Sequence, residues 1–220
     1  DSLYIGEIKD VLTENESVDF LGMDACLMGM TEIAYEIRPD TGDFGAQAMA
    51  FSPAEEQEDG WEYQNIINRF GSTDLDAMEG VDFARIVVEE YENAFFDHPG
   101  ETQTAVDLEK IGDVKVAVDG LARLLVDYKD KVELIRGSSS DYISDSTSEP
   151  PLMHYFDASS GYDWENYASF DLYDLAWRIR ESIDFPVEIQ NKAGTLMEMI
   201  ESAIIYSWAG TRYNGEELGG

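Results

Sequence analysis

Short apolar runs alternate with amphipathic stretches along the 220 residues of the chain. Three runs are too short for helices and are bounded by turn residues, so they predict buried strands at 17–23, 43–52 and 101–108. Apolar positions recur at helical spacing elsewhere and predict helices at 3–13, 27–37, 60–70, 82–96, 111–135, 167–182 and 187–210. Strands that alternate with helices indicate an α/β fold with a mostly parallel sheet flanked by helices.

One domain is expected over residues 1–220, because no internal repeat or long linker divides them. With 44% hydrophobic residues, the chain can bury a core despite its charge. The polar stretch 136–151 predicts a surface loop. No apolar run reaches the roughly 18 residues of a membrane-spanning helix. The chain opens on Asp1 without a signal peptide, which suggests a processed or trimmed product.

The charge is strongly acidic, with 47 Asp and Glu against 14 Lys and Arg and a net charge of −33. Nucleic acid is not an expected partner, because binding phosphates requires clustered basic residues. An acidic surface keeps a protein soluble, suits high salt, attracts Ca²⁺ or draws in cationic substrates. The charge alone leaves these alternatives open.

The single cysteine, Cys26, lies two residues after Asp24 in the stretch LGMDACLMGM. One cysteine excludes an internal disulfide and a Cys-rich zinc site, which leaves a packing residue, a metal ligand or a nucleophile. The pattern places Cys26 just past the first strand and at the start of a helix, where α/β proteins carry their active sites. A helix N-terminus would favour a thiolate. The Asp24 carboxylate would oppose it, so Asp24 either holds a cationic substrate group or only caps the helix.

A family resemblance narrows these alternatives. The segment DFLGMDACLMGMTEIAYEI resembles the nucleophile segment of the clostripain-type cysteine peptidases. The similarity continues in order through FSPAEEQEDGWEY, TQTAVDL, FDLYDLAWRI and SAIIYSWAG, the last of which resembles that family's last helix. The residues that carry it are Asp24, Cys26, Met28, Glu32, Tyr35, Glu36, Ser52, Gly60, Trp61, Tyr63, Thr104, Asp171, Leu172 and Asp174.

The resemblance implies a caspase-like fold and a peptidase with a Cys–His dyad. The Cys26 thiolate would attack the scissile carbonyl, and the Cys26 backbone N–H would donate to the oxyanion. The family prefers Arg or Lys before the scissile bond, and Asp24 matches a position that lines its acidic pocket. The end of the strand at Ser52 would form a second pocket wall. The acid that lines it is left open by the family's varying register across Ala54, Glu55 and Glu56, and Glu55 is the favoured one.

The sequence has no histidine at the place where the dyad histidine is expected. In caspase-like enzymes it precedes the cysteine by about 50 residues, and the 25 residues before Cys26 contain none. His98 and His154 lie downstream without the family's His-Gly pattern, and we expect surface or loop positions for both. The resemblance therefore implies an N-terminal segment or light chain that carries the histidine and one or more central strands, and a final C-terminal strand, all outside this sequence. A fragment, or a chain that has lost catalysis, is the alternative.

The predicted function is a bacterial, secreted or cell-envelope cysteine endopeptidase that processes itself and cleaves peptides or proteins after Arg or Lys. The alternative is a non-catalytic caspase-like acidic module that binds basic peptides or calcium. The chemistry requires no cofactor. Calcium is left open without assigned ligands, because the acidic stretches 40–43 and 55–59 lack EF-hand spacing and are typical of solvated turns.

Overall fold

The computed structural model describes residues 7, 13–39, 41–53, 56–98, 101–136, 154–155, 169–210, 212–213 and 216–217. The chain forms two compact units. One contains residues 1–112 and 202–220, and the other contains 113–201. The prediction of one peptidase domain over 1–220 is not tested by this grouping and stays a prediction.

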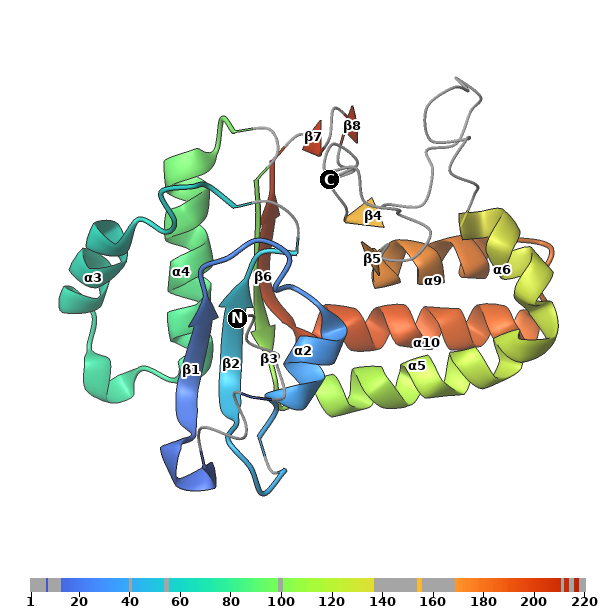
Figure 1. Ribbon diagram of the computed structural model, residues 1–220, viewed down its shortest axis with the longest axis horizontal. Helices are drawn as coiled ribbons and strands as arrows, with labels where there is room; N and C mark the ends of the chain where they lie inside the picture. Colours follow the sequence, from blue (N-terminus) through green and yellow to red (C-terminus); the bar gives the residue numbers. More distant parts are fainter. Residues whose placement is uncertain are drawn as a thin grey trace. The chain divides into compact units, whose positions relative to one another are not determined.

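The first unit is built on a four-stranded sheet in the order β1-β2-β3-β6 (Figure 1). Its strands are β1 (Val18–Met23), β2 (Ala46–Phe51), β3 (Thr102–Asp107) and β6 (Ile204–Ala209). β1 and β2 are parallel, whereas β3 is antiparallel to both of its neighbours. The sheet is therefore mixed, and the prediction of a mostly parallel sheet is wrong for two of its three pairings. A hydrophobic run identifies a buried strand but does not encode its direction.

Small residues let a helix lie close against this sheet. Ala48, Ala50 and Ala105 are fully buried in one cluster with side chains of α4 (Gly80–Phe95) and α3 (Tyr63–Gly71). α4 also begins tightly against β1, because a Cβ added at Gly80 would lie 1.9 Å from the carbonyl oxygen of Asp19. Close packing of this kind fixes α4 and the residues that follow it relative to the strand ends.

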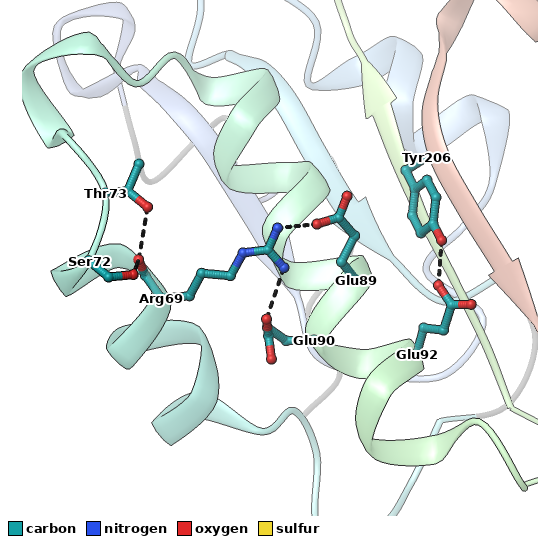
Figure 2. A network of polar contacts seen from close by, with 7 residues as sticks. All are labelled: Arg69, Ser72, Thr73, Glu89, Glu90, Glu92 and Tyr206. Carbon is teal, nitrogen blue, oxygen red and sulfur yellow. Dashed lines mark hydrogen bonds and ion pairs between the residues drawn. The ribbon is translucent and has the colours of Figure 1, made fainter.

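Polar contacts join the elements on this side of the sheet (Figure 2). Arg69, in the last turn of α3, reaches across to α4 and binds Glu89 and, at 2.9 Å, Glu90. The Tyr206 hydroxyl on β6 donates to Glu92 on α4. The ion pairs hold α3 to α4, and the tyrosine ties α4 to the edge strand.

The helix predicted at 27–37 begins late. α2 covers only Thr31–Glu36, lies on the other side of the sheet from α4 and connects the two parallel strands (Figure 1). Residues 24–30 form an irregular turn instead. Leu27 has a backbone φ of 61°, which is incompatible with a right-handed helix. The same unit contains the 3₁₀ turns Glu14–Glu16 and Leu75–Ala77 and the short strands β7 (Arg212–Tyr213) and β8 (Glu216–Glu217).

The described part of the second unit is mainly helical. It contains α5 (Ile111–Leu125, which begins in the first unit), a 3₁₀ turn (Val126–Tyr128), α6 (Lys129–Arg136), α9 (Leu172–Glu181), α10 (Val187–Ala203) and the paired strands β4 (His154–Tyr155) and β5 (Ser169–Phe170). Apolar side chains of α5, α9 and α10 and the α9–α10 loop form its buried positions, namely Val114, Leu121, Ala176, Ile179, Phe185, Ile189, Ala193, Leu196 and Met197.

Three further predicted helices are wrong in extent. The one at 167–182 begins only at Leu172, because Ser169–Phe170 pairs with β4 as β5. The one at 111–135 is interrupted by a 3₁₀ turn that no Gly or Pro marks. The one at 187–210 ends at Ala203, because Ile204–Ala209 pairs with β3 as β6. The β-branched and aromatic residues of this segment favour a strand, so only Ser202 and Ala203 of SAIIYSWAG belong to a helix. The predicted elements at 3–13 and 136–151 lie almost wholly outside the described residues.

Candidate active site

The candidate nucleophile and its neighbours lie at one edge of the sheet. Met23 at the end of β1 pairs with Phe51 at the end of β2, and Phe51 pairs with Thr104 on β3. The turn after β1, the residues after β2 and the start of β3 therefore meet at this edge. Cys26 is exposed on the turn after β1, past the strand end as predicted.

The turn that carries Cys26 is held in an unusual conformation. Leu27, the next residue, has a positive φ of 61°, which costs a non-glycine residue about 1–3 kcal/mol. The Gly29 N–H donates to the Ser52 carbonyl at 2.9 Å. A Cβ on Gly29 would lie 2.5 Å from Pro53 Cα, so only glycine fits there. The residues after β2 thus fix the turn, and because α2 begins at Thr31, the predicted helix N-terminus at Cys26 is wrong.

The Cys26 thiol contacts the main chain of the loop after β2. Its Sγ donates a weak hydrogen bond to the Glu56 carbonyl oxygen at 3.8 Å. The cysteine is otherwise exposed, in contrast to a packing residue. An incoming carbonyl group can therefore approach the sulfur from solvent.

Asp24 is exposed, but one of its oxygens is fully engaged. Asp24 Oδ2 accepts hydrogen bonds from the Tyr63 hydroxyl at 2.7 Å and from the Trp61 backbone N–H at 3.3 Å. Gly60 has a φ of 73°, and a Cβ there would lie 2.6 Å from the same oxygen. The hydrogen bond to Asp24 is the main reason that the pKa of Tyr63 rises to about 12. The Gly-Trp-x-Tyr segment thus forms a cradle for the Asp24 carboxylate.

A second carboxylate, Glu56, lies buried in the same loop. Its Oε1 accepts hydrogen bonds from the Trp61 indole N–H and from the Gln103 side-chain amide, the latter at 2.9 Å. Among the described residues, its buried Oε2 has no hydrogen-bond partner. Burial raises the pKa of Glu56 to about 7, helped by the charges of Asp24 and Glu101 and opposed by the two hydrogen bonds. Glu56 is therefore an acid that changes charge near neutral pH.

Polar contacts continue from Glu56 to the start of β3. The side-chain nitrogen Nε2 of Gln57 lies 2.7 Å from Glu101 Oε1 and 2.5 Å from His98 Nδ1. The Tyr91 hydroxyl donates to Glu101 and accepts from the Gln57 backbone N–H, both at 3.2 Å. His98 thus contacts Gln57, whereas Cys26 contacts the Glu56 carbonyl. The side chain of His154 lies outside the described residues.

The second predicted pocket wall differs in detail from expectation. Ser52 is fully buried, and its hydroxyl shares a hydrogen bond of 2.9 Å with Thr102. Its backbone carbonyl holds the Cys26 turn, so Ser52 acts through the main chain. Glu55 lies outside the described residues and stays a prediction. Sequence reasoning named Glu56 without preferring it and missed Gln103. The sequence signal that could have indicated a buried Glu56 was Trp61, which lies five residues later and can donate an indole hydrogen bond to a carboxylate.

Comparisons with known proteins show the family of the chain. The profile of the clostripain family, peptidase family C11, matches residues 1–220, and the chain therefore belongs to this family of cysteine peptidases. The chain is 34% identical over 239 aligned residues to clostripain from Hathewaya histolytica. The match covers 99% of this chain but only 44% of clostripain, so the chain spans less than half the length of that relative.

Solved structures show the same fold. A cysteine protease from B. fragilis matches 100% of this chain and 79% of its own, at 16% identity and a TM-score of 0.63. A secreted C11 cysteine protease from Bacteroides thetaiotaomicron, bound to an irreversible peptide inhibitor, matches 97% of this chain and 52% of its own, at 14% identity and a TM-score of 0.62. At these identities the likeness concerns the fold alone.

The described residues also bear on metal binding and on insertion into a membrane. In those ranges no group of three or more His, Cys, Asp or Glu side chains is arranged to hold a metal ion. None of the helices described there is long and apolar enough to cross a bilayer. The expectation that catalysis needs no cofactor, with calcium left open, stays a prediction.

Proposed function

We propose that this chain is the cysteine-bearing part of a caspase-like endopeptidase that cleaves after Arg or Lys. The observation that carries the proposal is the pairing of an exposed thiol and an exposed carboxylate, two residues apart, on one rigidly held turn. Cys26 is the nucleophile. Asp24 binds the basic side chain of the substrate.

The reaction forms and breaks one thioester. The Cys26 thiolate attacks the scissile carbonyl carbon, and the C–S bond forms as the carbonyl electrons move to oxygen. The Cys26 backbone N–H donates to that oxyanion. Collapse breaks the C–N bond, and a histidine gives its proton to the leaving amine. The same histidine then takes a proton from water, which attacks the thioester and releases Cys26.

Charge supports the preference for basic substrates. The chain has a net charge of −33, so its field attracts cationic peptides. Asp24 supplies an exposed carboxylate close to the thiol, and a charge-assisted hydrogen bond to an ammonium or guanidinium group is strong. Glu55 and the backbone near Ser52 complete the wall of this pocket.

The dyad histidine comes from a segment outside these 220 residues, a light chain released by self-cleavage. Among the described strands, β1 pairs with β2 and leaves its other edge unpaired. The side chains of β1 are exposed or half-buried, whereas all but one of those of β2 are buried. Backbone groups at a free edge pair readily with another strand. This contrast supports an added strand beside the nucleophile, which would extend the sheet and bring the histidine to Cys26.

The likeness to a secreted C11 protease supports a bacterial, secreted or cell-envelope location.

The test is cleavage of Arg-containing and Lys-containing peptides by the full-length gene product and its Cys26→Ala variant. We expect cleavage after the basic residue, and a loss of about 10³-fold or more in the variant, because no other group can form the thioester. A peptide with Ala in place of Arg is the control and should be cleaved poorly. Unchanged turnover by Cys26→Ala would contradict the proposal. Tight binding of basic peptides without cleavage would favour the non-catalytic module instead.

A further inference from the structure

We propose that Tyr63 determines how Asp24 meets a basic side chain, by occupying one carboxylate oxygen so that Lys is accepted almost as well as Arg. The inference rests on the proposed function, in which Asp24 binds the basic residue of the substrate. It adds a specificity-determining residue that acts through Asp24.

The hydrogen-bonding capacity of one Asp24 oxygen is already used within the protein. A carboxylate oxygen offers two lone-pair sites. Both sites on Oδ2 are used, one by the Tyr63 hydroxyl at 2.7 Å and one by the Trp61 backbone N–H at 3.3 Å. Within the described part of the chain, Oδ1 of Asp24 accepts neither of these hydrogen bonds nor any other. Asp24 is exposed, so Oδ1 is the oxygen available to substrate.

Arg and Lys differ in how many carboxylate oxygens they need. A guanidinium binds a carboxylate best as a fork, with one N–H to each oxygen. An ammonium is a compact point charge and needs only one oxygen. With Oδ2 filled, Arg loses the second bond of its fork, whereas Lys loses nothing. Tyr63 therefore removes the advantage that Arg would otherwise have.

The tyrosine is held in place independently of its hydroxyl. Its ring packs against that of Trp61, with centroids 6.1 Å apart. Trp61 is buried in the core of the first unit. A Cβ on Gly22 would lie 2.7 Å from the Trp61 ring, so this indole is closely packed on β1. Tyr63 itself is 52% exposed, and a Tyr63→Phe variant should keep both the fold and the ring position.

The experiment measures kcat/KM of the full-length enzyme for two peptides that differ only in Arg or Lys before the scissile bond. Tyr63→Phe frees one site on Oδ2 and should raise the Arg:Lys ratio about tenfold, the size of one added charge-assisted hydrogen bond. The change should come mainly from a lower KM for the Arg peptide. In an Asp24→Asn background, the same substitution should leave the ratio unchanged.

Tyr173→Phe is the matched control. It removes a tyrosine–carboxylate hydrogen bond of the same kind, to Glu201 at 2.6 Å, within the second unit. It should leave the Arg:Lys ratio as in the wild type. An unchanged or lower ratio in Tyr63→Phe, or an equal rise in the Asp24→Asn background, would overturn the inference alone. If the wild type cleaves neither peptide, the proposed function is contradicted and the inference is overturned with it.

Discussion

Trp61 links the two carboxylates of the site. Its backbone N–H donates to Asp24, and its indole N–H donates to Glu56. Because the indole is buried, the two acids are fixed relative to each other and close enough for the charge of Asp24 to raise the pKa of Glu56.

The first prediction concerns the cost of ionising Glu56. Its pKa rises from 4.5 to about 7 in the folded protein, so between these pH values the folded chain holds a proton that the unfolded chain releases. The free energy of unfolding should fall as pH rises through this window, by about 3 kcal/mol in all. Glu56→Gln cannot ionise and should not show this fall. Urea denaturation at pH 5 and pH 8 measures the difference.

Glu58→Gln is the control for Glu56→Gln, because Glu58 is exposed in the same loop. Its pH dependence should follow the wild type. Parallel stability curves for Glu56→Gln and the wild type would contradict the pKa that burial gives Glu56.

At this scale the sequence predicts the positions of the exposed residues Cys26 and Asp24 better than the contacts of the buried ones, and the roles of both residues stay predictions. Cys26 and Asp24 were identified because a lone thiol next to a carboxylate, in a family-like motif, is a strong local pattern. Glu56 could not be separated from Glu55 by spacing. Glu56 is buried against Trp61 and Gln103, and Gln103 belongs to a strand 47 residues further along the chain, so spacing cannot show this contact.

At the scale of elements, α3 and α4 pack through apolar side chains and are also joined by the ion pairs of Arg69 (Figure 2). Arg69 binds Glu89 and Glu90 together, and these contacts raise the pKa of its guanidinium. Without the arginine, two neighbouring carboxylates would face each other in a protein that already has a net charge of −33. This contact differs from a single surface ion pair, because three charges share it.

The second prediction tests that contact. Arg69→Met keeps an apolar stem but removes the charge, and we expect the free energy of unfolding to fall by about 1 kcal/mol, near the upper end for partly exposed ion pairs. The loss should shrink at 1 M NaCl, because salt screens the pair and the repulsion that replaces it. Arg180→Met, which removes one exposed pair with Glu181, should cost less. Equal losses in the two variants would contradict a special role for Arg69.

Elements were predicted well where one strong period extends over the whole segment. The strands at the start of the chain and the helices that became α3 and α4 are examples. The boundaries failed where tertiary pairing decides the outcome. Ile204–Ala209 continues the apolar pattern of α10, but β3 offers it backbone partners, so it becomes a strand. The pattern also could not show that β3 runs antiparallel to both of its neighbours.

At the scale of the whole molecule, we propose that this acidic chain carries a reactive cysteine beside a pocket for a basic side chain. Family membership fixes the class of cysteine peptidase, whereas a dyad histidine supplied from outside these 220 residues stays a prediction. The chain covers 44% of clostripain, so it spans less than half the length of that relative.

The most direct measurement is labelling of the full-length protein by a peptide reactive inhibitor with Arg at the reactive end, located by peptide mass spectrometry. We predict one adduct, on Cys26. The Arg inhibitor should form it much faster than a matched inhibitor that has a neutral side chain in place of Arg. Asp24→Asn should remove most of this preference, because the carboxylate no longer pairs with the guanidinium. Labelling of Cys26 at equal rates by the basic and neutral inhibitors would contradict a pocket for a basic side chain beside Cys26. No labelling of Cys26 would contradict its role as the nucleophile.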